Sequence, residues 1–460
     1  MRVSQATQAL GARYSGGDVE FTAVSTDSRR MECGALFVAL KGERFDGHAF
    51  IAQAAGAGAA AVLVEHASDI KLPQIMVDDT TRALGRLGNY WRRRFDIPLV
   101  ALTGSNGKTT VREMLAAILR EACKASQSST LDPQSCVLAT RGNLNNHIGV
   151  PLTLLELRRA HRYAVIEMGM NHAGELSYIT QLAEPDVALI NNAGTAHLEN
   201  FGSAEAIARA KGEIFEGLKT AGVAVINADE HYAPLWRELA SGKHRLEFAL
   251  EAKAAVTATC KIRQLDSEIV LKTPLGEART VVPAPGLHNV KNALAASAAA
   301  TALAVPAATI AAGLVCFGGV TGRLQYKVAA QGATLIDDTY NANPDSVRAA
   351  IAVLAQAPGA RLLVLGDMGE LGRHAIAMHT QVGEFACQAG IDRMVTLGEL
   401  SEHASRAFGT GARHFTRIDD LLAAIGNVLT PEVTLLVKGS RFMQMERVVA
   451  ALTGEQAGGH

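Results

Sequence analysis

Cysteine is scarce in this sequence, and the few cysteines form no metal-binding pattern. Six cysteines lie among 460 residues, at positions 33, 123, 136, 260, 316 and 387, and none belongs to a Cys-x-x-Cys pair. This spacing argues against a zinc site and against a disulfide framework. We therefore predict buried, reduced thiols in a cytoplasmic protein.

The sequence also lacks an excess of charge and a long, strongly apolar run. With a formal net charge of −1, no overall field attracts the chain to nucleic acid or to an anionic membrane. The N-terminal stretch MRVSQATQALGARYSGG has no apolar core of signal-peptide length. Residues 292–322 are uncharged but mostly alanine, and Pro306 divides them, so two helices on a sheet are expected rather than a membrane span. We expect a soluble protein without membrane insertion, most simply a monomer.

Three blocks of different texture predict an α/β fold with three domains, since the chain is too long for one ordinary core. Residues 1–80 contain short strand-like runs and form a small α/β module. Residues 81–318 alternate continuous apolar runs with helical stretches, which is typical of a parallel sheet covered on both faces. Within this block, residues 255–283 are predicted as short antiparallel strands. Residues 319–460 restart the alternation as a doubly wound domain, without a Gly-x-Gly-x-x-Gly after its first strand.

A glycine-rich loop, TGSNGKTT at residues 103–110, connects an apolar strand to a helix. Free backbone N–H groups at the start of that helix favour an anion. Lys108 can reach the β- and γ-phosphates of a nucleotide, and the Thr109 hydroxyl can bind Mg²⁺. The common phosphate loop has a glycine five residues before Gly107, where this chain has Leu102. We still predict an ATP site; the alternative is a glycine-rich turn with a solvated lysine.

Three further residues are candidates for the same edge of the sheet. Glu167 ends an apolar strand, and a carboxylate there is either bound to metal or paired in a salt bridge. His197 follows the next apolar strand and reaches the same edge if the two strands are neighbours, although a lone loop histidine is more often solvated. Spacing alone places Lys211 on a solvated helix face, paired with Glu213 or Glu216.

Taken in order, the segments TGSNGKTT, VIEMG, GTAHLENFGS, ARAKGE, GLHNVKNALAA and DDTYNAN resemble the Mur ligases. These are the ATP-dependent amide-forming enzymes of peptidoglycan precursor synthesis. The resemblance covers all three blocks, and the short Gly-x-x-Gly-Lys-Thr loop is the family's own form. Folylpolyglutamate synthetase and cyanophycin synthetase share the central domain more distantly. The resemblance implies a UDP-sugar module, a central P-loop domain with a parallel sheet, and a Rossmann-like C-terminal domain.

The resemblance also implies roles for individual residues. Glu167 and Thr109 would bind one Mg²⁺, and His197 would bind a second. Lys211 matches the lysine that the family carbamylates with CO₂, which converts a cation into an anionic metal ligand. With Lys108, these residues form the predicted catalytic set. The implied ATP-binding residues are Thr103, Gly104, Ser105, Asn106, Gly107, Lys108, Thr109, Thr110, Asn292, Arg323 and Asp338.

The segment STDSRR within the first block resembles the family's UDP-sugar module, and Asp27, Ser28 and Arg29 match its nucleotide-sugar signature. The third block lacks the Asp-Asn-Pro-Arg tetrapeptide of the diaminopimelate-adding member. The similarity therefore favours the member that joins D-alanyl-D-alanine to UDP-N-acetylmuramoyl-tripeptide. Whether the third residue of that tripeptide is diaminopimelate or lysine stays open.

The segments DDTYNANPDS, LGDMGELG and NLNNHIGVPLTLL carry this closer similarity. It implies that Tyr340, Asn341 and Asn343 lie near the amine of the dipeptide. As an alternative, Asn-Ala-Asn-Pro is an ordinary turn in which Asn343 or Asp345 caps the following helix.

The implied chemistry is the activation of a carboxylate by ATP. Phosphoryl transfer gives an acyl phosphate and releases ADP, the dipeptide amine attacks the acyl phosphate, and the tetrahedral intermediate collapses to an amide and phosphate. Lys108 and two Mg²⁺ would offset the negative charge. The third domain is expected to swing closed, with Arg323 and Asp338 near the hinge. The alternatives are the tripeptide-forming Mur ligase, a folate-type glutamate ligase, and a P-loop ATPase acting as a motor or regulator.

Overall fold

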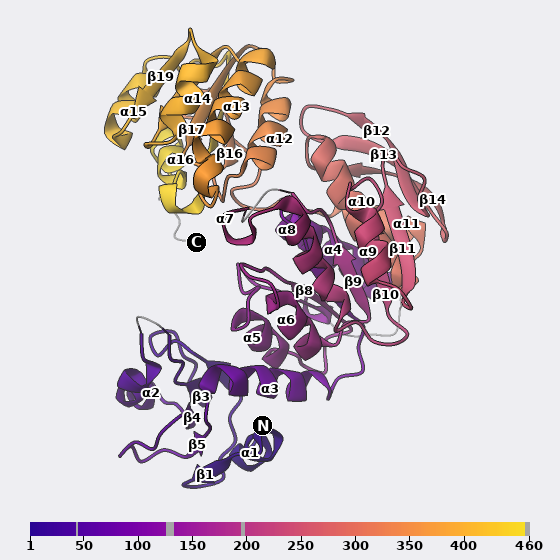
Figure 1. Cartoon of the computed structure of the whole chain (residues 1–460), viewed down its shortest axis with the longest axis vertical. Coiled ribbons are helices and arrows are strands. Elements are labelled where there is room, and N and C mark those ends of the chain that lie inside the picture. The colour runs from indigo at the N-terminus through magenta and orange to yellow at the C-terminus, as the bar shows by residue number, and fades with distance from the viewer. Residues whose placement is uncertain (43–44, 126–132, 195–197, 456–460) are drawn as a thin grey trace.

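The computed structural model describes residues 1–42, 45–125, 133–194 and 198–455, and its strands form three separate sheets. Figure 1 shows three lobes along the long axis of the molecule, with the N-terminal lobe at one end and the C-terminal lobe at the other. No helix within the described residues is long and apolar enough to cross a membrane. Each sheet falls within one of the three predicted blocks, and the boundaries at residues 80 and 318 remain a prediction.

The first sheet has five strands in the order β1-β5-β4-β3-β2. Its strands are β1 (Arg13–Ser15), β2 (Ala23–Ser25), β3 (Ala35–Val38), β4 (Ala61–Val64) and β5 (Gln74–Met76). Its helices are α1 (Val3–Leu10), η1 (Gly47–Phe50), α2 (Ile51–Gly56) and α3 (Thr80–Arg92). Alternate strand residues face opposite sides, so Leu36 and Leu63 contact the α1 and α3 side, while Phe37 and Val62 contact α2.

The central sheet has nine strands in the order β14-β13-β12-β11-β10-β9-β6-β8-β7. They are β6 (Leu99–Thr103), β7 (Val137–Ala139), β8 (Tyr163–Glu167), β9 (Val187–Ile190), β10 (Val223–Asn227), β11 (His244–Ala249), β12 (Val256–Ile262), β13 (Ser267–Thr273) and β14 (Gly276–Val282). Pairing is parallel from β7 to β12 and antiparallel from β12 to β14. The prediction of short antiparallel strands at residues 255–283 is confirmed.

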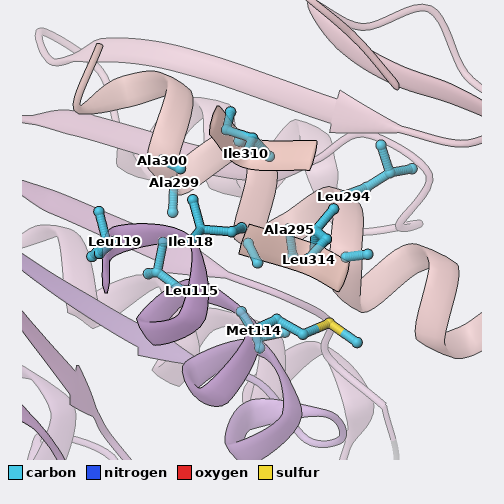
Figure 2. Packing of buried hydrophobic residues seen from close by; sticks show 14 of the residues in the cluster. Met114, Leu115, Ile118, Leu119, Leu294, Ala295, Ala299, Ala300, Ile310 and Leu314 are labelled. Atoms are coloured by element: carbon cyan, nitrogen blue, oxygen red, sulfur yellow. The ribbon is translucent and has the colours of Figure 1, made fainter. Parts of the chain in front are cut away.

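Helices cover both faces of the central sheet. They are α4 (Lys108–Ala125), η2 (Pro133–Cys136), α5 (Gly149–Leu155), α6 (Glu175–Ala183), α7 (Leu198–Phe201), α8 (Ala204–Gly212), η3 (Glu213–Phe215), α9 (Ala233–Leu239), α10 (Leu287–Ala302) and α11 (Ala307–Val315). Figure 2 shows Ile118 of α4 packed between α10 and α11. A Cβ at Gly313 would lie 2.3 Å from the Ile118 Cα, so α11 needs glycine there to approach α4 this closely. The prediction of two packed helices divided by Pro306 is thus confirmed.

The third sheet has the order β15-β16-β20-β17-β18-β19 and is parallel except for the edge strand β15. Its strands are β15 (Gln325–Val328), β16 (Thr334–Asp338), β17 (Ala360–Gly366), β18 (Arg393–Leu397), β19 (Ala412–Phe415) and β20 (Val433–Lys438). Its helices are α12 (Pro344–Leu354), η4 (Gly372–His374), α13 (Ala375–Gln388), α14 (Ser401–Phe408), α15 (Ile418–Gly426), η5 (Arg441–Met443) and α16 (Glu446–Thr453). The predicted doubly wound domain is confirmed.

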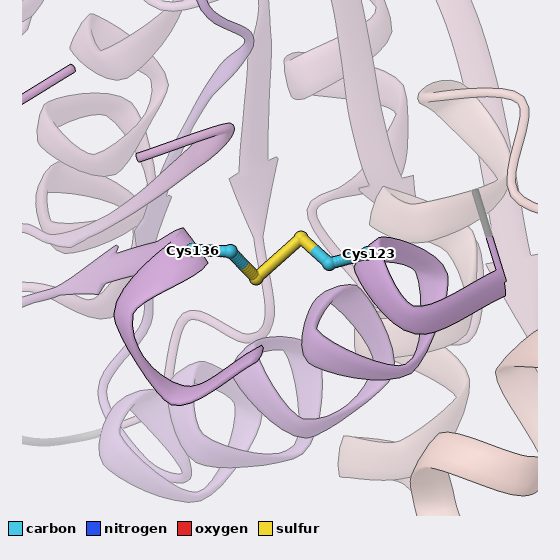
Figure 3. The surroundings of a disulfide bond; sticks show 2 residues. All are labelled: Cys123 and Cys136. Atoms are coloured by element: carbon cyan, nitrogen blue, oxygen red, sulfur yellow. A yellow bond between two sulfur atoms is a disulfide. The ribbon is translucent and has the colours of Figure 1, made fainter. Parts of the chain in front are cut away.

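The cysteines depart from the prediction of buried, reduced thiols. Cys123, near the end of α4, forms a disulfide with Cys136 at the end of η2 (Figure 3). Their Cα atoms lie 6.8 Å apart because the chain returns to the end of α4 before it enters β7. Of the remaining four, Cys33, Cys316 and Cys387 are exposed. The spacing of cysteines along the sequence could not show this pairing, because it depends on the return of the chain.

Candidate functional site

The phosphate-loop candidate lies in the middle of the central sheet. Its strand, β6, runs between β9 and β8, and Lys108 is the first residue of α4. The Lys108 Nζ donates to the carbonyl of Gly104 at 2.7 Å, so the side chain folds back over the loop. Gly107 has a φ of +79°, and a Cβ there would lie 2.2 Å from Asn292 Oδ1. Only glycine permits this conformation and this close approach to α10.

A half-buried lysine, Lys108, and a buried one, Lys211, influence each other near this loop. Burial lowers the pKa of Lys108, and the nearby Glu167 carboxylate partly opposes that effect. Lys211 on α8 is 2% exposed, and burial holds its pKa well below the usual value, with a further contribution from the charge of Lys108. Within the described residues, Lys211 forms no hydrogen bond or ion pair that would stabilise its charge. The predicted solvated face with Glu213 or Glu216 is wrong, because α8 turns this side chain into the core.

Glu167 ends β8 as a buried carboxylate with two partners. Its Oε2 accepts from Arg112 Nη1 at 3.1 Å, and its Oε1 accepts from Asn145 Nδ2 at 2.9 Å. Both side chains of the ion pair are almost fully buried. The salt-bridge alternative is therefore present, but the carboxylate also borders the cavity described below. Arg112 lies one helical turn after Lys108, and this i, i+4 spacing in the sequence places both side chains on the same face of α4.

The loop after β9 holds the phosphate loop from its other side. Asn191 Nδ2 donates to the carbonyl of Asn106 at 3.0 Å, and Asn192 Oδ1 accepts from the Asn106 N–H at 2.8 Å. Because β6 separates β8 from β9, these two strands are not neighbours as the His197 prediction required. His197 itself lies outside the described residues. No cluster of three or more His, Cys, Asp or Glu side chains suited to a metal occurs in the described part of the chain.

Two residues from beyond the central sheet reach the phosphate loop. Arg323 lies in the connection to the third sheet, and Asn343 lies in the turn between β16 and α12. Arg323 Nη2 donates to Thr109 Oγ1 at 3.3 Å, and its guanidinium lies 4.4 Å from the centre of the Tyr340 ring. Asn343 Oδ1 accepts from the Ser346 N–H and caps α12, as the turn alternative predicted. Its Nδ2 also donates to Asn106 Oδ1 at 2.7 Å. One residue thus connects the N-terminus of α12 to the phosphate loop.

A cavity of about 1410 Å³ lies between the central and third sheets. Predicted site residues that border it are Ser105, Asn106, Gly107, Lys108, Thr110, Glu167, Asn292, Arg323, Asp338, Tyr340, Asn341 and Asn343. Single drug-sized ligands occupy cavities of about 300–1,000 Å³, so this one has room for more than one small molecule. The lining of the cavity does not include Lys211 or Thr109.

Further polar residues border the cavity that the sequence did not single out as site residues. Glu230 accepts from the Ala193 N–H at 3.2 Å, and burial raises the pKa of its carboxyl group. Burial lowers the pKa of His288 to about 4, against a smaller opposing effect of Asp338. Others are Asn143, Asn145, Asn227, Lys438 and Arg441, and the apolar Phe442 also borders the cavity. These residues are far apart in the sequence, and the loops that bring them together follow strand ends.

The three residues predicted to bind a nucleotide sugar lie just after β2, away from this cavity. Arg29 Nη2 and Asp27 Oδ2 form an ion pair at 2.8 Å, and the hydrogen bonds from Arg29 hold the pKa of Asp27 at about 2. Ser28 is buried, and its Oγ donates to Gln53 Oε1 at 3.1 Å. Their role as a UDP-sugar site stays a prediction.

Three family models match consecutive parts of the chain. They are "Mur ligase family, catalytic domain" at residues 20–120, "Mur ligase middle domain" at residues 102–300, and "Mur ligase, glutamate ligase domain" at residues 322–441.

Curated proteins and solved structures give the same similarity over almost the whole chain. The UDP-N-acetylmuramoyl-tripeptide–D-alanyl-D-alanine ligase of Escherichia coli (strain K12) is 44% identical and aligns over 98% of each chain. Its counterpart from Bacillus subtilis is 37% identical over 93% of this chain and 92% of its own. A crystal structure of MurF from Acinetobacter baumannii superimposes with a TM-score of 0.91, at 38% identity and 98% coverage of both chains. MurF from Thermotoga maritima in complex with ADP gives 0.81, at 26% identity over 94% and 97%.

Proposed function

This chain belongs to the Mur ligase family, and we propose that its large cavity is where it joins D-alanyl-D-alanine to UDP-N-acetylmuramoyl-tripeptide. The protein is an ATP-dependent ligase of peptidoglycan precursor synthesis. The observation that carries the proposal is the position of the phosphate loop. It lies on one wall of a cavity whose other wall consists of the strand ends of the third sheet.

The central wall supplies groups suited to ATP. Like any helix, α4 begins with backbone N–H groups that have no partner within the helix, and these would face the β-phosphate, while Lys108 would offset the charge that builds up on the transferred γ-phosphoryl group. Asn292 lies against the loop, since a Cβ at Gly107 would lie 2.2 Å from its Oδ1. The carboxylate of the tripeptide attacks the γ-phosphorus, and the dipeptide amine then displaces phosphate from the acyl phosphate.

A magnesium ion fits the oxygen donors at the end of the phosphate loop. Mg²⁺ prefers a few carboxylate and hydroxyl ligands together with water and substrate phosphates. Glu167 and Thr109 are donors of this kind, and Arg112 and Asn145 fix the orientation of the Glu167 carboxylate. When bound, the ion would neutralise phosphate charge and act as a Lewis acid. We assign His197 to a second such ion on the family resemblance alone.

The burial of Lys211 supports a carbamate at this position. CO₂ reacts with the neutral amine of lysine, and burial lowers the pKa of Lys211, which favours that form. The carbamate carries a negative charge, which would replace the unfavourable repulsion between Lys211 and Lys108 by attraction. It would also supply oxygen atoms toward the metal site.

The remaining substrates are assigned to the outer lobes. The UDP end of the UDP-linked tripeptide would be held by Asp27, Ser28 and Arg29. Its peptide end would extend toward the cavity. Tyr340 and Asn341 would lie near the incoming dipeptide amine, while the amide of Asn343 is engaged with its own helix and with Asn106.

Phosphate release under defined substrate mixtures tests this function. The protein is incubated with ATP and UDP-N-acetylmuramoyl-tripeptide, together with D-Ala-D-Ala, diaminopimelate, lysine, glutamate or no acceptor amine. We expect release with the dipeptide only, together with a UDP-linked pentapeptide detected by mass spectrometry. Release without any amine would indicate an ATPase, and release with an amino acid alone would indicate a different ligase.

A further inference from the structure

Three strands of the third sheet end at the same wall of the cavity. The last strand of the chain, β20, lies between β16 and β17, and all three are parallel. The segments that follow them place Tyr340 and Asn341, Gly369 and Glu370, and Ser440 to Phe442 along the cavity. In open α/β sheets, ligands bind at carboxyl strand ends where the strand order changes direction. From β16 to β19 the strands follow one another in one direction across the sheet, and β20 reverses this direction by returning between β16 and β17.

The cations on this wall differ in how far they are already paired. Lys438 is buried, and its Nζ donates to Asp338 Oδ2 at 2.6 Å and to the carbonyl of Asn341 at 2.9 Å. Arg323 is engaged with Thr109 and with the Tyr340 ring. These two cations hold the protein's own groups in place.

Arg441 is the third cation, and one edge of its guanidinium is unused. Its Nη1 donates to Glu446 Oε1 at 2.9 Å, and its backbone N–H donates to Asn341 Oδ1 at 3.3 Å. No group in the described part of the chain accepts a hydrogen bond from its Nε or Nη2, and the side chain remains 42% exposed. Nε and Nη2 form the edge that binds a carboxylate through two parallel hydrogen bonds. Glu446 thus holds the guanidinium while this edge stays available.

Phe442 adds an apolar surface beside this cation. It is 64% exposed, which is unusual for an aromatic residue that borders a cavity. A Cβ at Gly369 would lie 2.9 Å from its Cε1 atom, so the ring rests against the backbone of the segment after β17. Its position is therefore supported on one side, while much of its surface faces solvent.

We propose that Arg441 binds the C-terminal carboxylate of the dipeptide and that Phe442 packs against the dipeptide's methyl groups. This inference rests on the proposed function. The amine of the dipeptide must reach the acyl phosphate near the phosphate loop, so its carboxylate lies at the far end of the molecule. Arg441 provides the cation with an unused bidentate edge on the opposite wall. Arg441 and Phe442 thus select the incoming dipeptide by its free carboxylate and its small apolar side chains.

The test compares D-Ala-D-Ala with D-alanyl-D-alaninamide, which keeps the reactive amine but lacks the anionic carboxylate. In the wild-type protein, the KM of the amide should exceed that of the dipeptide by about 10- to 100-fold, since a hydrogen-bonded charge is lost. In Arg441→Ala, the KM of the dipeptide should rise by the same factor, and the two acceptors should become nearly equivalent. The KM values of ATP and of the UDP-linked substrate should stay within about twofold.

Three variants separate recognition from structural damage. Arg447→Ala removes a nearby arginine that bonds only to backbone carbonyls and does not border the cavity, so it should behave as wild type. Glu446→Gln removes the ion pair but leaves Arg441, so it should keep most of the discrimination. Arg441→Lys retains the charge without the bidentate edge and should discriminate to an intermediate degree. If Arg441→Ala does not fold, Arg441→Lys still permits the comparison between the dipeptide and its amide.

The outcomes distinguish a failure of the Arg441 proposal from a failure of the proposed function. If folded Arg441 variants still prefer the carboxylate over the amide, Arg441 does not bind it. The same holds if the substitution raises the KM of the UDP-linked substrate instead. If the wild-type protein forms no amide bond with D-Ala-D-Ala at all, the proposed function fails first.

Discussion

The two walls of the cavity treat their charged groups differently. On the side of the central sheet, the half-buried Lys108 borders the cavity and the buried Lys211 does not, the pKa values of both are lowered, and Lys211 has no partner among the described residues. On the wall of the third sheet, Lys438 is also buried but is paired with Asp338 at 2.6 Å. An unpaired buried charge is costly, and a paired one fixes the geometry of its neighbours. We infer that Lys108 on the central wall is available to arriving phosphate groups, whereas Lys438 on the third wall fixes the positions of its own neighbours, Asp338 and Asn341.

Replacement of Lys108 on the central wall should have the largest effect on the rate of amide formation. Lys108→Ala removes the cation nearest the predicted γ-phosphate, and we expect amide formation to fall by about 10²- to 10³-fold. The measurement is phosphate release with all three substrates. Lys124→Ala is the matched control, because Lys124 is an exposed lysine on the same helix, paired with Glu121. Equal losses in both variants would assign the effect to α4 rather than to phosphate binding.

The carbamate proposal predicts chemical rescue. Lys211→Ala should lower activity on the order of 100-fold, and acetate or formate should restore part of it by placing a carboxylate in the vacated space. Lys211→Met fills that space and should not be rescued. With ¹³C-labelled CO₂, the wild-type protein should give a carbamate carbon signal that Lys211→Met lacks. A Lys211→Ala variant with full activity and no response to acetate would contradict the proposal.

The contact between the walls can be tested at Asn343, which both caps α12 and donates to Asn106. Asn343→Ala should lower the free energy of unfolding by about 1 kcal/mol because the cap is lost. Asn343→Ser keeps a capping oxygen but lacks the Nδ2 that reaches the phosphate loop. We expect Asn343→Ser to retain most of the stability while raising the KM of ATP. Urea unfolding and steady-state kinetics measure the two effects separately, and equal behaviour of both variants would show that only the cap matters.

The smallest expected effect is a pH dependence at His288, which lies on α10 and faces Asp338 and Lys438 across the interface. Its pKa is lowered from 6.5 to about 4 by burial, so between these values the unfolded chain binds the proton more readily. The free energy of unfolding should therefore rise with pH from about 4 to 6.5, and this contribution is lost as the pH falls. His288→Gln should flatten the slope of urea midpoints in that window. The exposed His244→Gln serves as a control and should not.

Local pattern predicted the elements whose signals lie within a few residues. The phosphate loop, the parallel strands of the central sheet on either side of it in sequence, and the helix pair around Pro306 all appear where continuous apolar runs and glycine or proline place them. Two strands of the third sheet, β15 and β19, escaped prediction. They are short edge strands with partly exposed residues, so they carry no continuous apolar run.

Features that depend on packing between distant segments could not be predicted in this way. Lys211 looked solvated because its spacing from Glu213 and Glu216 suggested surface pairing, yet Trp236 of α9 packs beside its helix and donates to the carbonyl of Ala208. The ion pair between Arg112 and Glu167 joins residues 55 positions apart. The unused edge of Arg441 becomes visible only once its partner Glu446 and the cavity are both in place.

The central place of β20 also bears on how the chain is made. Residues 433–438 are near the C-terminal end of the sequence, yet they lie between β16 and β17 in the third sheet. During synthesis on a ribosome, both of those strands therefore wait with an unpaired edge until β18, β19 and finally β20 have emerged. Unpaired edges are prone to pairing with other chains. The same insertion that delivers Arg441 to the cavity thus leaves the third sheet incomplete until β20 has been made.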